Sequence, residues 1–257
     1  MRNQPNMLSI KNLKKDFNNG SFVVFKDLTF EVKEGEFIVI LGPSGTGKTV
    51  LLQTIAGFIR PTSGSIVQNG EEILCPSPKR YVVFQDYALF PWKTVFENVA
   101  FALEMKKISG AEKKKVVNRY LKMTGLTQFS DWHIHKLSGG MKQRVSVARA
   151  LASEADLLLM DEPFSSLDSG QRERLRLELE KIWLRTNKTI LFVTHDIEEA
   201  LTLADRIIIL GGRPAKITKE FKILQPRPRD IDSADLVKKR KKITEFIKQF
   251  KKERIKE

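Results

Sequence analysis

The chain has 257 residues, 41% of them hydrophobic and 30% charged, proportions typical of a soluble globular protein that is long enough to bury a full core. Its formal net charge is +14, and its apolar runs are strand-sized, far short of the ~20 residues that a membrane-spanning helix needs. The N-terminus lacks the apolar core of a signal peptide and Cys75 is the single cysteine, so we expect a cytosolic chain without an internal disulfide.

The first third of the chain predicts strands around one glycine-rich loop. Residues 22–41 contain period-2 stretches with a turn at Glu34-Gly35, which predicts an antiparallel strand group. The apolar run FIVIL at 37–41 leads into the loop, residues 49–58 predict the helix after it, and residues 62–73 predict a further turn and strand.

The rest of the chain alternates helical patterns with short apolar runs. Residues 94–124 are polar and helical, which suggests a helical insertion before the main sheet resumes. The runs at 157–162, 189–194 and 206–210 predict strands of a buried parallel sheet, and residues 171–185 predict an amphipathic helix between two of them. The pattern therefore predicts an α/β fold with a parallel core sheet.

The last twenty residues form a basic tail after a boundary marked by Pro226 and Pro228. Residues 238–257 carry ten Lys or Arg against three Glu, and the apolar residues Ile243, Phe246, Ile247 and Phe250 follow helical spacing. Such a helix can lie on anionic lipid or a partner, or it can cover part of its own domain. No aromatic-basic platform or recognition helix supports binding of nucleic acid.

The loop GPSGTGKT at 42–49 fits the pattern of a phosphate cradle between a strand and a helix. Its glycines let backbone N–H groups turn toward a phosphate, and the helix N-terminus adds positive potential. We expect Lys48 to reach the β- and γ-phosphates and the Thr49 hydroxyl to bind Mg²⁺.

Two further strand ends carry polar residues that suit the same chemistry. Asp161 ends the apolar run LLLMDE, where a carboxylate is costly unless it serves a cation, so it is a candidate ligand of Mg²⁺. Glu162 follows and is a candidate to polarise an attacking water, although it can also be a charge that merely leaves the strand. His195 follows the run TILFV and Thr194. It can be structural, or it can hydrogen-bond the γ-phosphate at the same sheet edge.

A second glycine turn, LSGGMKQR at 137–144, has Ser138 at a predicted N-cap before a helix. Bare N–H groups and a serine hydroxyl can hold a phosphate without a lysine, but they form only half of a site. A two-fold pair of chains solves this, because each turn then covers the nucleotide bound by the other chain's loop.

With these motifs in order, the sequence resembles the ATP-binding subunits of ABC transporters up to about residue 225. GPSGTGKT is similar to the Walker A motif, VVFQD (82–86) to the Q-loop, LSGGMKQR to the signature, LLLMDE to Walker B, SSLD (165–168) to the D-loop and VTHD (193–196) to the switch histidine. The resemblance implies a P-loop NTPase with a RecA-like parallel core sheet, an N-terminal antiparallel β subdomain and an α-helical signature subdomain. It implies a domain over 1–230, with the helical subdomain at roughly 87–150, and the charge and spacing of the residues after it predict a basic amphipathic tail over 231–257.

The resemblance also implies site residues, an activity and partners. The activity is ATP hydrolysis coupled to transport, with ATP and Mg²⁺ in the site. The partners are a second copy in a homodimer, two membrane-spanning permease subunits and an extracytoplasmic solute-binding protein, with no nucleic acid, at the cytoplasmic side of the membrane. The implied residues are Glu162, His195 and Gln85 for catalysis; Thr49, Gln85 and Asp161 for Mg²⁺; Phe17, Gly42, Pro43, Ser44, Gly45, Thr46, Gly47, Lys48, Thr49 and Val50 for ATP; Ser138, Gly139, Gly140 and Met141 for the partner's ATP; and Asp168 in the D-loop.

Three positions depart from the family's pattern. Met141 stands where the signature has glutamine, Val50 where a second Ser or Thr is common, and Phe17 where the aromatic under adenine is often tyrosine. Phe17 keeps a stacking face, although it can also be a core strand residue. None of the three departures removes a catalytic group.

Two later stretches are similar to the nitrate, sulfonate and taurine branch of bacterial importers. They are residues 88–103, which include Phe90, Pro91 and Trp92, and the RP segment at 211–221. These three residues are expected to line a groove for a short permease helix, although Trp92 can also be ordinary packing. We therefore expect an importer of small anions. The alternatives are a soluble, non-transport ABC ATPase acting on nucleic acid or ribosomes, and a module that only binds ATP.

Overall fold

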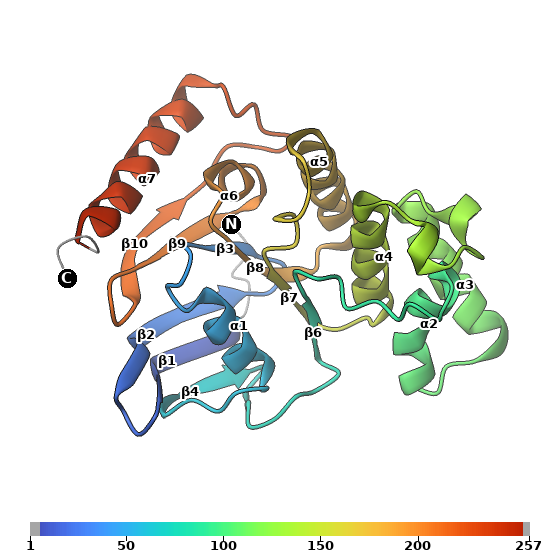
Figure 1. Cartoon of the computed structure of the whole chain (residues 1–257), viewed down its shortest axis with the longest axis horizontal. Coiled ribbons are helices and arrows are strands. Elements are labelled where there is room, and N and C mark those ends of the chain that lie inside the picture. The colour runs from blue at the N-terminus through green and yellow to red at the C-terminus, as the bar shows by residue number, and fades with distance from the viewer. Residues whose placement is uncertain (1–5, 254–257) are drawn as a thin grey trace. The chain divides into compact units, whose positions relative to one another are not determined.

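The structure is a computed structural model that describes residues 6–253, and the side chains of residues 6–248. Two compact units divide the chain (Figure 1): the first contains residues 1–77 and 188–257, and the second contains residues 78–187. The helical region expected at 87–150 lies in the second unit, and the tail expected from residue 231 lies in the first.

The first unit contains an antiparallel sheet of four strands in the order β2-β1-β4-β5. The strands are β1 (Asn6–Phe17), β2 (Phe22–Lys33), β4 (Ser63–Gln68) and β5 (Glu71–Glu72). In β2, residues Leu28, Phe30 and Val32 are buried while their neighbours are exposed, as expected for a sheet with one covered face. The predicted N-terminal strand group is therefore present.

The same unit contains the parallel strands that carry the glycine-rich loop. Strand β3 (Phe37–Leu41) lies between β8 (Thr189–Thr194) and β9 (Arg206–Gly211) and runs parallel to both, while β10 (Lys216–Lys222) runs antiparallel beside β9. Every residue of β3 and β8 is buried. Such continuous burial requires cover on both faces of the strands, which explains why their sequences are apolar runs rather than alternating patterns.

Helices α1 (Lys48–Ala56) and α6 (Ile197–Leu203) each follow a parallel strand of this unit. Helix α1 begins directly after the glycine-rich loop and ends at Gly57, whose φ of 85° is the left-handed value that terminates helices. Asp196 is the N-cap of helix α6, and its carboxylate accepts hydrogen bonds from the N–H groups of Glu198 and Glu199.

The second unit combines two parallel strands with four α-helices. Strands β6 (Arg80–Val83) and β7 (Leu157–Asp161) pair in parallel, and the helices are α2 (Val95–Met105), α3 (Gly110–Met123), α4 (Gly139–Ala152) and α5 (Ser169–Thr186). Two short 3₁₀ turns, Thr127–Phe129 and Ile134–Lys136, precede α4. Helices α2 and α3 both pack against α4, so the predicted helical insertion forms a small bundle around the helix of the second glycine turn.

Helix α2 starts with a capping box. Thr94 accepts a hydrogen bond from the Glu97 N–H, and the Thr94 N–H donates to the Glu97 carboxylate at 2.7 Å. The hydrogen bond from the Thr94 backbone holds the pKa of Glu97 below its usual value.

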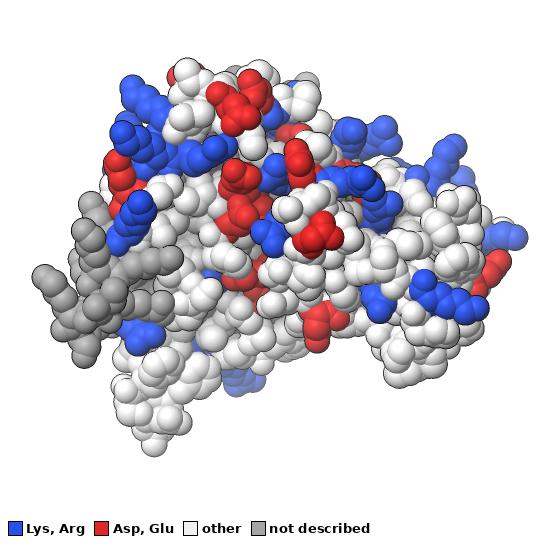
Figure 2. Space-filling view, turned by 45° about the horizontal axis from the view of Figure 1, so that its top comes forward, with Lys and Arg blue, Asp and Glu red and all other residues white. Residues whose placement is uncertain are grey.

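The basic tail forms helix α7 (Ala234–Glu253), which covers part of its own unit. Leu236 and Ile243 are fully buried, and the Phe246 ring meets the Phe221 ring of β10 edge to face at 6.1 Å between centroids. The side chain of Phe250 lies outside the described residues. Lysine and arginine side chains gather over α7 (Figure 2), with Lys238, Lys241, Lys242 and Lys248 exposed. The apolar face of the helix is therefore used in packing, and its charged face meets solvent.

Candidate nucleotide-binding site

The glycine-rich loop joins the end of β3 to the start of α1, as its sequence predicts. Gly47 has φ of 82°, and a Cβ there would overlap the Val24 side chain. A Cβ at Gly42 would come within 2.6 Å of the Leu210 carbonyl oxygen. Both positions therefore require glycine for the tight curl that turns backbone N–H groups inward.

Lys48 lies inside this curl. Its ammonium group donates hydrogen bonds to the carbonyl oxygens of Gly42 and Pro43 at 3.0 and 3.1 Å, and the residue is 4% exposed. The Thr46 hydroxyl donates to the same Pro43 carbonyl at 2.8 Å. Ser44 and Thr49 are exposed, so the loop opens to solvent where a phosphate would enter.

His195 lies at the same sheet edge as the loop. The paired residues Leu41 and Thr194 end β3 and β8, and the Gly42 N–H donates to the Thr194 carbonyl at 3.4 Å. The Thr194 hydroxyl donates to the buried Glu199 carboxylate at 2.6 Å, which fixes the end of the strand. His195 itself is exposed just beyond this point, so the strand pairing brings it to the edge from which the loop rises.

Phe17 ends β1 and is 38% exposed, so it is not a core residue. The Lys15 ammonium lies 4.7 Å from the centre of its ring, a cation–π contact. The structure therefore contradicts the alternative that Phe17 fills the core and leaves its ring available as a stacking surface.

In the second unit, Gln85, Asp161 and Glu162 lie at the carboxyl ends of two neighbouring strands. Strands β6 and β7 run in parallel with Val83 opposite Met160, so the residues after them leave the same edge. Asp161 is 7% exposed, while Gln85 is exposed. Glu162 has φ of 43°, a left-handed value that is unusual for a non-glycine residue and concentrates at functional sites. The Ser165 hydroxyl and N–H both donate to the Glu162 carbonyl, which holds this turn.

The second glycine turn opens α4. Ser138 is the N-cap, and its hydroxyl accepts a hydrogen bond from the Met141 N–H at 3.3 Å. Asp168 caps the neighbouring helix α5 in the same way, by accepting from the Gln171 N–H at 2.9 Å. A cavity of about 200 Å³ lies between the first turns of these two helices and is lined by Ser138, Gly140, Met141, Arg144, Gln171, Arg174 and Leu175.

Tyr87, which the sequence did not single out, lies in a segment that is hydrogen-bonded to helix α4. The Arg149 guanidinium donates to the carbonyl oxygens of Tyr87 and Ala88 at 3.0 and 2.8 Å, and the Ser146 hydroxyl donates to the same Tyr87 carbonyl at 3.3 Å. Tyr87 has φ of 65°, which no local pattern signals. Helix α4 is thereby tied to the segment that follows Gln85.

The candidate site residues therefore fall into two sets, one in each unit. The first unit contains the phosphate loop, Phe17 and His195, and the second contains Gln85, Asp161, Glu162, the Ser138 turn and Asp168. The candidate ligands of Mg²⁺ supply hydroxyl, amide and carboxylate oxygens, the donors that this ion prefers. Among the described residues, no helix has the length and apolar character needed to cross a membrane.

The chain is similar to several known proteins. The chain is 44% identical over 243 residues to an uncharacterized ABC transporter ATP-binding protein of Methanocaldococcus jannaschii, covering 94% of this chain and 91% of that protein. It is 45% identical to a taurine import ATP-binding protein of Roseobacter denitrificans, covering 84% of this chain and 82% of that protein. It is 43% identical to a bicarbonate transport ATP-binding protein of Synechococcus elongatus, covering 87% and 82%.

Solved structures share the fold as well. The ATP-binding cassette MJ0796, in a dimeric post-hydrolysis state bound to ADP and Pi, superposes with a TM-score of 0.74 at 34% identity, covering 86% of this chain and all of that one. The fold is thus that of a P-loop NTPase, as predicted. The ABC transporter family matches residues 25–165, and the chain belongs to this family. Because these relatives are named as transporter subunits, the alternative of a non-transport ATPase is not favoured.

Proposed function

We propose that this chain is the ATP-binding and ATP-hydrolysing subunit of an importer that takes up a small anion through separate membrane subunits. The observation that carries the proposal is the likeness to proteins named for taurine import and bicarbonate transport, at 45% and 43% identity over more than four fifths of the chain. The cargo does not contact this subunit. The proposal therefore names only the chemical class of the cargo, a small anion such as taurine, a sulfonate or nitrate.

ATP binds in the curl of the phosphate loop. The Lys48 ammonium exchanges its two carbonyl partners for β- and γ-phosphate oxygens, and the N–H groups of residues 42–49 hold the β-phosphate. The exposed ring of Phe17 stacks on the adenine. Val50 supplies no side-chain hydroxyl, so any contact of this residue with the α-phosphate comes from its backbone.

Hydrolysis uses residues that lie at strand ends. Glu162 accepts a proton from the attacking water as the water oxygen bonds to the γ-phosphorus, and the bond to the β–γ bridging oxygen breaks so that ADP leaves with its electron pair. His195 donates a hydrogen bond to the γ-phosphate and holds the water in line. The Thr49 hydroxyl, Gln85 amide and Asp161 carboxylate would hold Mg²⁺, which neutralises charge on the phosphate oxygens.

The second glycine turn serves the nucleotide of a partner copy. Ser138, Gly139, Gly140 and Met141 present a helix N-terminus, and none of the four is a lysine or an acidic residue that could complete a site. Two copies arranged head to tail place this turn over the other copy's γ-phosphate, and Asp168 then lies near the junction. The dimeric state of the cassette MJ0796 supports this arrangement.

The permease subunits are proposed to dock at an aromatic patch formed by Phe90 and Trp92. Trp92 is 71% exposed and its ring lies 5.6 Å from that of Phe90, which in turn lies 4.6 Å from Phe101. An exposed tryptophan that packs on partly buried phenylalanine rings suits a short helix of a membrane subunit. The chain then lies at the cytoplasmic side of the membrane, with a solute-binding protein on the opposite side.

The decisive variant is Glu162→Gln, which keeps the shape of the side chain and removes its ability to accept a proton. We expect ATP binding to persist, turnover to fall about 10²–10⁴-fold, and ATP-loaded dimers to accumulate in size-exclusion chromatography. Glu173→Gln, an exposed glutamate of α5, is the matched control and is expected to turn over ATP normally. Unchanged turnover in Glu162→Gln would refute the assignment of this base.

The transport part of the proposal needs a separate test. The chain is co-expressed with candidate permease subunits and a solute-binding protein, and the purified complex is placed in vesicles. We expect ATP-dependent uptake of a small anion that the binding protein recognises. If the chain purifies as a homodimer and none of the co-expressed permease subunits co-purifies with it, the transport proposal is contradicted, even if the chain hydrolyses ATP.

A further inference from the structure

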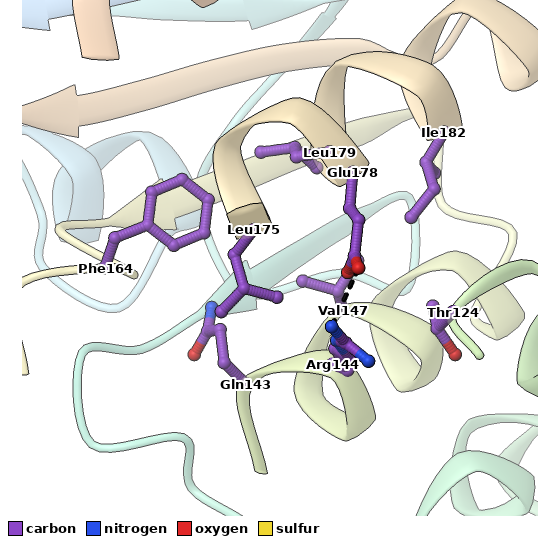
Figure 3. A pocket seen from close by; sticks show the side chains of 9 residues that line it. All are labelled: Thr124, Gln143, Arg144, Val147, Phe164, Leu175, Glu178, Leu179 and Ile182. Atoms are coloured by element: carbon purple, nitrogen blue, oxygen red, sulfur yellow. Dashed lines mark hydrogen bonds and ion pairs between the residues drawn. The ribbon is translucent and has the colours of Figure 1, made fainter. Parts of the chain in front are cut away.

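A small cavity lies between helices α4 and α5 of the second unit (Figure 3). Its walls include Gln143 and Val147 of α4, Leu175 and Leu179 of α5, and Phe164 from the segment after β7. The space open to the centre of a water molecule is about 10 Å³, roughly the room of one water. The two helices therefore do not close fully on each other at this point.

Gln143 brings an unpaired amide to this contact. The residue is fully buried, and neither its Nε2 nor its Oε1 has a hydrogen-bond partner among the described residues. Figure 3 shows the side chain beside Leu175, on the side of the cavity where Phe164 also lies. A glutamine amide offers two donors and two acceptors, so burial without partners is unfavourable.

The next residue of α4, Arg144, has a charged partner on α5. The Arg144 guanidinium pairs with the Glu178 carboxylate of α5 at 2.7 Å, across the same cavity. An ion pair therefore links the two helices, while the amide beside that pair has no hydrogen-bond partner among the described residues. Such a local conflict in a native fold concentrates at functional sites, where a second arrangement satisfies the group.

The position of Gln143 in the chain connects it to two parts of the proposed reaction. It lies two residues after Met141, in the turn proposed to meet the partner's nucleotide, and it lines the cavity with Phe164, which is two residues after Glu162. A shift of α4 along α5 changes the surroundings of the amide and of the segment that follows Glu162 together. Packed helices make such shifts between discrete arrangements.

We propose that Gln143 is a positioning residue, whose buried amide gains hydrogen bonds only when α4 moves against the segment after Glu162 as the signature turn takes up the partner's nucleotide. The unpaired amide raises the free energy of the resting arrangement and so favours the catalytic one. This inference rests on the proposed function, because it assigns Glu162 and the signature turn to one ATPase reaction.

The test is Gln143→Met, which keeps the length of the side chain and removes its hydrogen-bonding groups. Without nucleotide, we expect the melting temperature to rise by about 2–4 °C, the shift expected for a domain of this size when one unsatisfied polar group is removed. The kcat for ATP is expected to fall about tenfold while KM stays unchanged, because the phosphate loop keeps its contacts. Gln143→Leu serves as a second variant and is expected to change both values in the same directions.

Leu179→Met is the matched control, since Leu179 lines the same cavity without a polar group. It is expected to leave kcat unchanged and not to raise the melting temperature. A fall in the melting temperature of both Gln143 variants would show that the amide is already satisfied at rest, and a rise without loss of kcat would show that it has no part in the reaction. Either result overturns the proposal. A wild-type chain that hydrolyses no ATP would instead contradict the proposed function, and the melting temperatures would still report on the amide.

Discussion

The hydroxyl groups of Tyr87 and Ser166 lie 2.8 Å apart, within hydrogen-bonding distance, in the second unit. Tyr87 follows Gln85 by two residues, and Ser166 precedes Asp168 by two. A side chain added at Gly139, the first residue of α4, would meet the same Tyr87 hydroxyl at 3.3 Å. One tyrosine therefore contacts the segment after Gln85, the turn before α5 and the start of α4.

Removal of that hydroxyl is expected to weaken ATP turnover. Tyr87→Phe keeps the ring and the carbonyl that accepts from Arg149, and it deletes only the contact with Ser166. A single hydrogen bond of this kind supports an effect of about three- to tenfold on kcat, with ATP affinity unchanged because the phosphate loop is untouched. A double-mutant cycle with Ser166→Ala, read in steady-state ATPase assays, checks the coupling. Fully additive losses would mean that the two hydroxyls act separately.

Lys48→Ala is expected to reduce ATP affinity tenfold to a hundredfold. The buried ammonium is held by two carbonyl oxygens of the loop, so it is already positioned to donate charge-assisted hydrogen bonds to phosphate. Equilibrium titration with a fluorescent ATP analogue measures the change. Lys33→Ala, an exposed lysine of the same unit, is expected to bind ATP normally. Full affinity in Lys48→Ala would exclude the loop as the phosphate site.

Phe17→Ala is expected to weaken ATP binding about three- to tenfold and to leave thermal stability nearly unchanged. The ring is 38% exposed, so its loss creates no internal cavity, whereas stacking on adenine is lost. Its partner across the strand pair, Phe22, is 59% exposed and provides the control variant Phe22→Ala. Equal losses of affinity in both variants would argue against a specific stacking role for Phe17.

Ile243→Ala is expected to lower the stability of the chain by about 2–4 kcal/mol and the melting temperature by about 5–15 °C. Ile243 is fully buried where α7 packs on the first unit, although it belongs to a tail whose sequence is dominated by lysine. Calorimetry checks the value against Lys241→Ala, whose side chain is exposed and whose loss is expected to be neutral. A neutral Ile243→Ala would indicate that α7 does not contribute to the fold.

Short motifs were predictable because their geometry is local. GPSGTGKT and LSGGM specify backbone conformation within a few residues, and glycine, serine and a following helix are sufficient to orient N–H groups. The apolar runs at 37–41, 157–162 and 189–194 likewise predicted buried strands, since continuous burial leaves a continuous apolar sequence.

The sequence by itself thus determined the phosphate loop, the second glycine turn, the buried strands and the family to which they point. Only the tertiary structure decided that β8 pairs with β3, that Phe17 stays exposed, and that α7 packs on its own unit. It alone revealed the contact between Tyr87 and Ser166 and the unpaired amide of Gln143. These features depend on which distant segments meet, and the free energy of such contacts comes from packing and burial that no short stretch of chain specifies.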